Sequence, residues 1–511
     1  MNKQYILLLL AIVCFALPST AQEATFHKIN ESWTLNADGS SAYRQYKELT
    51  LHTHTAMNRT YGETFITYNP KFQTLTINDS YTKQKDGTIV RTPENAFVDV
   101  LPKAAADAPA YNHLLEKVVV HTGLELGATI YLDYTLTSKA GYLPEIDICK
   151  TIRQSSPTKL HTFSISVPKG KELNAEVTVL KANPKVSTTD QGTTYVWTLR
   201  NVKPEPIEAF ASIYTKETPF FVASTANHAN AKQIITEQWN KKGDTQLLTL
   251  SETITKGIAD RDKKIDAIRA FVVSNLGYSP LKMAENGFRF RPVNDIIQSA
   301  YGTEIEKINL LHGLLAAQGI TSEVEAVNVP VSNEACLGLS SIQEWQVAVK
   351  KDGKMQRLTA TGRAGINLET AETKTINKTI KLSPKAANAK GSYLILALPS
   401  DAASIARMGY QSLPSKRYNS LMLAAPVEET HRYEVALKGL SMTSPIGNKE
   451  IVNQVGSLTQ SIEIKGSEAI LVRKLSIAKR TISPKDYPAF RQLINAYTNP
   501  AAAQLLLKVE N

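Results

Sequence analysis

The chain has 511 residues, of which 42% are hydrophobic and 21% are charged, and its formal net charge is +11. This is the composition of ordinary globular domains, and the length predicts two to four of them. The lysines and arginines are spread along the chain rather than clustered. We therefore expect the positive charge to favour solubility and contact with anionic envelope surfaces, and we expect no nucleic-acid partner.

The first residues, MNKQYILLLLAIVCFALPSTAQEA, have the pattern of a secretory signal peptide. Lys3 supplies the positive charge, residues 6–17 the apolar stretch, and Ser19-x-Ala21 a small-residue cleavage site. The apolar stretch is too short to cross a bilayer, and Cys14 lacks the small residue that lipidation would need before it. We predict cleavage after Ala21, a periplasmic or secreted mature chain with no transmembrane segment, and a net charge of +10 after Lys3 leaves.

Two cysteines, Cys149 and Cys336, remain in the predicted mature chain. They lie far apart in the sequence and do not form a disulfide framework, and a metal site would need more ligands. We expect two separate small apolar residues, and no metal or cofactor.

Residues 22–225 are predicted to be one domain, with β-strands throughout residues 22 to about 205 and a proline-containing linker, NVKPEPIEAFASIYTKETPFF, after them. RQYKELTLHTHT, GATIYLDYTLTS and TTYVWTL alternate apolar and polar residues and are rich in Thr, Val, Ile and Tyr. Turn signals such as Lys85-Asp86-Gly87 separate the strands. Many short strands at this spacing are typical of a β-sandwich.

Residues 226–375 change to a helical pattern followed by strands. DRDKKIDAIRAFVVSNLGY, PVNDIIQSA and YGTEIEKINLLHGLLAAQGI are predicted helices, and Gly277 and Gly319 are expected to end the first and the third. SEVEAVNV and EWQVAVKKDGKMQRLT are predicted strands, the second with a hairpin turn at Asp352-Gly353. This order indicates an α+β domain.

Residues 376–511 are predicted to be rich in β-strands and to end in one helix. That helix is expected to begin at Ser483-Pro484 and to cover the last sheet with an apolar face formed by Tyr487, Phe490, Leu493, Ile494 and Tyr497.

DAIRAFVVSNLGY and YGTEIEKINLLHGLLAAQGI resemble the corresponding stretches of transglutaminase-like domains, which are relatives of the papain-type cysteine hydrolases. The whole chain resembles exported bacterial proteins that join an uncharacterised N-terminal β-sandwich domain to that domain and a C-terminal β-domain. That wider resemblance rests on YNPKFQTLTINDSYTKQKDGTIVRTPENAF, LEKVVVHTGLELGATIYLDYTL and DYPAFRQLINAY. It implies a multi-domain α+β protein with a β-sandwich, a central transglutaminase-like (papain-like) domain and a C-terminal β-rich domain.

In active members of that family, a Gly-Asp-Cys-Lys-Asp-Lys sequence opens the third helix and supplies the nucleophile. Here the nucleophile position falls on Glu304, the base position on Glu344 in EWQVAV, and the third position on Thr359 in RLTAT. A thiol nucleophile needs a base and a group that orients the base. Losing such a unit costs roughly 10⁴- to 10⁶-fold in rate. We therefore expect no catalysis by the family mechanism.

Glu304 has two interpretations. Thr303-x-x-Glu306 has the pattern of a capping box, and Glu304 in the first turn suits the helix dipole. Alternatively, Glu304 and Glu344 form a new carboxylate pair that acts as acid and base or binds a cation. Capping is the favoured interpretation.

Other candidates also have two interpretations. Arg289 and Arg291 in GFRFRP could bind an anion or pack at the edge of the former cleft. Trp345 could line that cleft or belong to the core. His52 and His54 could be two ligands of a zinc site or lie on an exposed strand face.

The predicted function is that of a non-catalytic binding or scaffolding protein of the cell envelope. Its inactive transglutaminase-like domain, near Glu304, Glu344 and Trp345, or the surfaces of its β-domains would bind a peptide, a glycan or a protein. The alternative is an enzyme whose catalytic carboxylates have been relocated.

Overall fold

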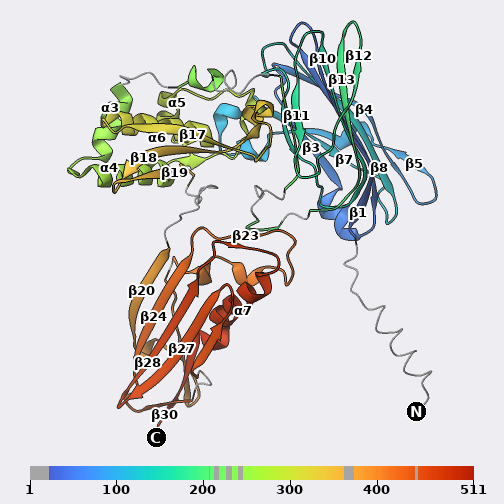
Figure 1. Cartoon of the computed structure of the whole chain (residues 1–511). Helices are drawn as coiled ribbons and strands as arrows, with labels where there is room; N and C mark the ends of the chain where they lie inside the picture. Colours follow the sequence, from blue (N-terminus) through green and yellow to red (C-terminus); the bar gives the residue numbers. More distant parts are fainter. Residues whose placement is uncertain are drawn as a thin grey trace, which may run out of the picture. The chain divides into compact units, whose positions relative to one another are not determined.

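The computed structural model describes residues 22–205, 208–211, 218–225, 233–239, 245–361, 373–401, 403–443 and 447–510. The chain forms two compact units: residues 1–205 with 214–362, and residues 206–213 with 363–511. It is a multi-domain α+β protein with a large N-terminal β-sheet region, a helical middle segment and a C-terminal β-rich region (Figure 1). The predicted boundaries at residues 225 and 375 stay predictions, and the first unit contains both the β-sheet region and the helical segment.

Among the residues that the structure describes, no helix is both long and apolar enough to cross a membrane.

A large sheet of eight strands forms the frame of the N-terminal region, in the order β12-β13-β10-β1-β2-β8-β4-β5. All neighbours pair antiparallel except β1 and β10, which are parallel. Alternating burial along the strands gives the sheet one inner face. The strands are β1 (Ala24–Leu35), β2 (Ser41–Leu51), β4 (Gln73–Lys83), β5 (Ile89–Arg91), β8 (Thr129–Ser138), β10 (Thr158–Pro168), β12 (Lys185–Thr188) and β13 (Gly192–Val202).

Two small sheets cover that inner face. One has the order β11-β14-β9 and the other β3-β7-β6. Trp33 and Tyr43 pair across β1 and β2, so they share a face of the large sheet; Trp33 packs with the first small sheet and Tyr43 with the second. The strands are β3 (Glu63–Tyr68), β6 (Phe97–Val100), β7 (Leu115–Val120), β9 (Asp147–Thr151), β11 (Asn174–Val177) and β14 (Phe220–Ser224).

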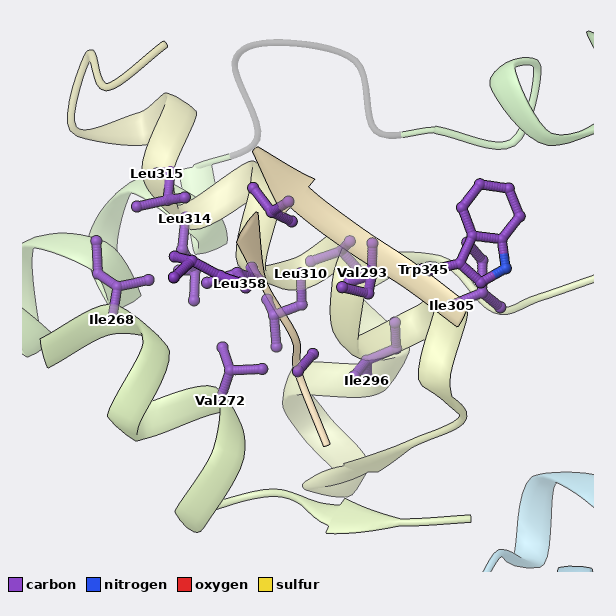
Figure 2. Packing of buried hydrophobic residues seen from close by; sticks show 14 of the residues in the cluster. Ile268, Val272, Val293, Ile296, Ile305, Leu310, Leu314, Leu315, Trp345 and Leu358 are labelled. Carbon is purple, nitrogen blue, oxygen red and sulfur yellow. The ribbon is translucent and has the colours of Figure 1, made fainter. Parts of the chain in front are cut away.

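The helical segment packs α3 to α6 and a three-stranded sheet around one apolar core. The Asp260 carboxylate caps α4 by accepting the Lys263 N–H at 2.8 Å. Figure 2 shows this core, which extends from Leu314 through Leu310 to Ile305 and Trp345. The elements are α3 (Thr245–Ile254), α4 (Arg261–Ser274), α5 (Val293–Ser299), α6 (Glu304–Ala317), β17 (Ser322–Asn328), β18 (Ile342–Lys351) and β19 (Lys354–Leu358).

Several local predictions are confirmed in this segment. The helix of the YGTEIEKINLLHGLLAAQGI stretch is α6, and Gly319, with φ +68°, follows its end. Asp352 and Gly353, both with positive φ, form the turn between β18 and β19, where Lys351 pairs with Lys354.

The second unit is built on a five-stranded sheet, β20-β24-β28-β27-β26, and a four-stranded sheet, β21-β22-β30-β25. The predicted apolar face of the last helix is confirmed, because its five predicted residues are buried in one cluster with Leu458 and Leu475. The helix, α7 (Tyr487–Thr498), begins later than predicted, since Asp486 is its N-cap. The strands are β20 (Lys374–Leu382), β21 (Asn388–Lys390), β22 (Tyr393–Ala397), β24 (Val427–Ala436), β25 (Leu440–Met442), β26 (Lys449–Val452), β27 (Gly456–Lys465), β28 (Glu468–Ile477) and β30 (Gln504–Val509).

Candidate functional site at the amino end of helix α6

The start of α6 is held by the carboxylate of its third residue. Thr303 is the N-cap, and Glu306 Oε2 accepts the Thr303 N–H at 2.9 Å. This arm of the predicted capping box is confirmed. A side chain on Gly302 would lie 3.2 Å from Glu306 Cβ, which explains the glycine before the cap.

Glu306 is also the centre of a buried ion pair. Arg291 reaches it at two points, with Nε 3.0 Å from Oε1 and Nη2 3.0 Å from Oε2. Tyr111 donates its hydroxyl to Oε1 at 2.5 Å. Burial alone would raise the pKa of Glu306, but the hydrogen bonds from Arg291 and Tyr111 outweigh it and hold this pKa below its usual value. The carboxylate is therefore charged and fully partnered at neutral pH.

Tyr111 belongs to a segment of the N-terminal region that lies on the helical segment. We call residues 103–114 the latch; it contains two short 3₁₀ turns, Lys103–Ala105 and Pro109–Tyr111. The Ala110 N–H donates to the Tyr301 hydroxyl at 2.8 Å, and the Ser279 hydroxyl donates to the Ala104 carbonyl at 2.7 Å. The latch is the light-blue segment beside α6 in Figure 1. It covers the side of the α6 start where Glu306 lies.

The two arginines of GFRFRP are both used inside the chain. Besides Glu306, Arg291 donates to the Tyr301 carbonyl at 2.7 Å, and its guanidinium lies 4.4 Å from the centre of the Tyr301 ring. The Arg289 guanidinium lies 5.0 Å from the centre of the Phe72 ring. The carboxylate that Arg291 binds is thus the protein's own, and an external anion would have to displace Glu306. These contacts favour the packing interpretation.

Glu344 and Trp345 lie on opposite faces of β18. Trp345 is 7% exposed, belongs to the core around α6, and packs edge-on against Trp239 with ring centres 6.3 Å apart. Figure 2 shows it beside Ile305. These contacts favour the core interpretation of Trp345. Glu344 is buried on the other face, where its carboxylate accepts a hydrogen bond from Gln346.

Glu344 and Gln346 share one face of β18, and Thr359 directly follows β19, whose last residue, Leu358, pairs with Val347. The Thr359 carbonyl accepts from Arg269 Nε at 3.2 Å. Glu304 is half-buried at the first position of α6, whose apolar residues pack against the Trp345 face. The hypothesis of a Glu304–Glu344 acid pair stays a prediction.

Both thiols of the described chain are free and packed in one apolar cluster. Cys336 lies in this cluster with Phe220 and Val222, and Cys149 packs against it. Burial raises the pKa of each thiol to about 12. The two cysteines were expected to be separate, but they pack in the same cluster. Neither is a thiolate at neutral pH.

The pair His52 and His54 differs from its predicted setting. Strand β2 ends at Leu51, so the two histidines lie in the turn after it and not on one strand face. The His52 ring is 2.8 Å from the Thr25 hydroxyl. Across the described ranges, no group of three His, Cys, Asp or Glu side chains is placed to hold a metal ion.

A pocket of about 190 Å³, which no sequence pattern predicted, lies between the N-terminal region and the helical segment. Glu145, Asp147, Glu285 and Ser340 are among its lining residues. The Asp147 carboxylate accepts the N–H groups of Leu339 at 2.7 Å and Ser340 at 2.9 Å. Burial nevertheless raises its pKa to about 6. Asp147 thus anchors the loop that leads into β18.

Two family profiles match the chain. A domain of unknown function, DUF3857, matches residues 37–206, and a second, DUF3858, matches residues 392–507. No curated protein matches. The crystal structure of a "putative protease" from Parabacteroides distasonis is similar to 95% of this chain and 99% of its own, with 38% sequence identity and a TM-score of 0.83. Identity at this level over nearly the full length of both proteins means that the chain belongs to the same family as the Parabacteroides protein, a family that carries DUF3857 and DUF3858 domains.

Proposed function

We propose that this protein is an exported, non-catalytic binding or scaffolding protein of the bacterial cell envelope. In this proposal its N-terminal region is a β-sandwich and its middle segment is a transglutaminase-like domain that has lost its Cys-His-Asp triad. The partner is a peptide, a glycan or a protein. The surface for it includes the Glu344 face of β18 and the start of α6.

The proposal rests on the residues at the start of α6 and on their contacts. A family nucleophile would stand at position 304, where this chain has a glutamate in the first turn. The neighbouring Glu306 is fixed by Arg291 and by Tyr111 of the latch. Cys336 is buried and Cys149 is half-buried, and the raised pKa values of both thiols disfavour the thiolate that acyl transfer requires. This part of the chain is thus arranged for stability.

The proposal is tested by comparing binding with catalysis on the same preparation. The purified chain is expected to retain partners from envelope extract and to leave peptide and transamidation substrates unchanged. A matched triple variant, Glu304→Gln, Glu344→Gln and Thr359→Val, is expected to remain folded and to alter partner capture only. Turnover by the wild-type chain that this variant abolishes would contradict the proposal. The exported state is tested separately by N-terminal sequencing of the protein from cells, which should begin at Gln22.

A second candidate is a hydrolase whose carboxylates act elsewhere. It is favoured by the name of the Parabacteroides relative and by the pocket, because Asp147, with a pKa of about 6, and Glu285, whose pKa is also raised by burial, could exchange protons there. Peptide cleavage by the wild-type chain that is lost in Asp147→Asn and retained in the triple variant would support this candidate. Cleavage that is lost in the triple variant and retained in Asp147→Asn would place the chemistry at the α6 start instead.

A further inference from the structure

A line of polar side chains runs along β1 and β2 between the two small sheets. We call this line the seam; it contains Glu31, Tyr43, Lys47, Thr64 and Lys150. Strand β9 is the edge of one small sheet and β3 is the edge of the other. Lys150 of β9 contacts Glu31 and Tyr43, and Thr64 of β3 contacts Lys47. Both edges therefore lie over the same two strands of the large sheet, and polar side chains meet between them.

The two lysines of the seam differ in their partners. Lys150 forms an ion pair with the buried Glu31 carboxylate and donates to the Tyr43 hydroxyl at 2.8 Å. Lys47 donates to the Thr64 hydroxyl at 2.5 Å. No carboxylate in the described part of the chain forms an ion pair or hydrogen bond with the Lys47 ammonium. The Lys150 ammonium is therefore neutralised by a carboxylate of the protein, and the Lys47 ammonium is not.

His121, a neutral histidine, lies behind Lys47 in the interior. His121 Nε2 is 2.9 Å from the Thr64 hydroxyl, and the ring is only 4% exposed. Burial and the nearby Lys47 lower the pKa of His121 to about 3. Its Nδ1 atom is buried and has no hydrogen-bond partner among the described residues. Lys47, Thr64 and His121 thus form a connected chain of polar groups with one open end.

The group formed by Lys47, Thr64 and His121 contains more hydrogen-bond donors than acceptors. The ammonium has three N–H groups, the hydroxyl one O–H and the neutral imidazole one N–H, against two lone pairs on the hydroxyl and one on the imidazole. Within these three side chains, donors outnumber acceptors whichever nitrogen of His121 carries the proton. A buried donor that lacks an acceptor is destabilising, and more so when it is charged. A negatively charged acceptor would match the positive charge and the excess of donors in this cluster.

We propose that Lys47, Thr64 and His121 form a binding site for the carboxylate group of a ligand that enters the seam beside the edge strand β3. Lys47 supplies the charge and two free N–H groups. Thr64 positions the ammonium through its hydrogen bond. His121 acts through Thr64 and is a positioning residue.

The seam can admit such a group. Lys47 and Thr64 both keep part of their surface exposed, whereas His121 lies behind them in the interior. Strand β3 is unpaired along its outer edge in the sheet order. Desolvation lowers the pKa of Lys47 to about 8, so most molecules carry the charge at pH 7. A carboxylate would satisfy the ammonium as Glu31 satisfies Lys150.

The test uses the purified full chain and acetate as the probe, with chloride at equal ionic strength as the reference. Acylation of individual lysines by a succinimidyl ester is followed by peptide mass spectrometry. Saturating acetate is expected to slow the acylation of Lys47 at least five-fold and to leave the exposed Lys83 unchanged. Equal rates for Lys47 in acetate and chloride, or an equal slowing of Lys83, would overturn the proposal.

A variant gives an independent reading that does not depend on lysine reactivity. Lys47→Met removes an unpaired ammonium and keeps the length of the side chain. It is expected to unfold at a higher urea concentration than the wild type in chloride, and to lose the stabilisation by acetate that the wild type has. Lys83→Met should behave as the wild type in both salts. Acetate that stabilises Lys47→Met as much as the wild type would refute the site.

Two further arms identify the source of the carboxylate. One compares Ala-Ala with its C-terminal amide, and the other compares glucuronate with glucose. The source is the ligand type whose carboxylate form protects Lys47 from acylation at a concentration at least ten-fold lower than acetate requires. Protection by acetate alone would still support the site and would restrict it to small acids.

Discussion

The Arg291 guanidinium and the Glu306 carboxylate form a two-point ion pair inside the protein, with Glu306 fully buried and the Arg291 side chain 13% exposed. The pair joins the loop before α5 to the first turn of α6. Tyr111 adds a contact from a segment 195 residues away in sequence. The start of α6 is therefore fixed by three separate parts of the chain.

Replacing Glu306 by Gln is expected to destabilise the first unit by about 3–5 kcal/mol, because the buried Arg291 would lose its counter-charge. Urea unfolding followed by tryptophan fluorescence measures this, since all four tryptophans (33, 197, 239 and 345) belong to the first unit. Glu323→Gln, at an exposed position of β17, is the control and should change stability by less than about 0.5 kcal/mol. Equal effects of the two variants would show that the ion pair contributes nothing.

Tyr111→Phe is expected to loosen the latch without unfolding the unit. The variant removes a hydrogen bond to a charged group, which is worth about 1.5–3 kcal/mol. Hydrogen exchange of the amides in residues 103–114 should become at least about ten-fold faster, since each 1.4 kcal/mol is a factor of ten. Tyr81→Phe, on the large sheet, should leave these amides unchanged. Unaltered exchange in Tyr111→Phe would mean that apolar packing alone holds the latch.

The raised pKa of Asp147 predicts a pH-dependent difference between the wild type and Asp147→Asn. The folded pKa, about 6, lies above the unfolded value of about 3.9. The contribution of this group to stability is thus present at acidic pH and is lost as the pH rises through 6. The wild type should lose on the order of 1–3 kcal/mol relative to the variant between pH 4 and pH 7. Urea unfolding of both proteins across this range is the measurement, and a constant difference would contradict the prediction.

Cys149 and Cys336 are expected to resist thiol reagents in the native protein. With a pKa of about 12, roughly one thiol in 10⁴ is ionised at pH 8, against about a quarter of ordinary cysteines. Colour development with a disulfide reagent should be at least about 10³-fold slower than for free cysteine. Denatured protein should show the full reaction and provides the control. Rapid labelling of one native thiol would point to a reactive nucleophile.

The features that the sequence predicted well depend on residues a few positions apart. The start of α6 follows from Thr303 and Glu306, its end from Gly319, and the hairpin from Asp352 and Gly353. The apolar face of α7 follows from spacing alone. The predicted setting of His52 and His54 was wrong because the alternation was extended past Leu51, where the ladder stops.

The candidate sites were harder to predict, because their partners are distant in the sequence. Nothing near Arg291 indicates that its anion is Glu306, and nothing near Glu306 indicates Tyr111. Asp147 binds N–H groups that lie 192 and 193 residues away. Every residue type except proline has a backbone N–H, so no residue pattern could predict that Asp147 binds these two groups. Such contacts follow from the fold of the whole unit.

The latch also has a consequence for where this chain can be divided. A fragment that began near residue 226 would keep Glu306, Tyr301 and Ser279 and lose Tyr111, Ala110 and Ala104, which bind them. The apolar residues beneath the latch, among them Leu281, would become exposed to water. The N-terminal region and the helical segment must then be made as one chain, and dividing the gene between them would yield two unstable fragments.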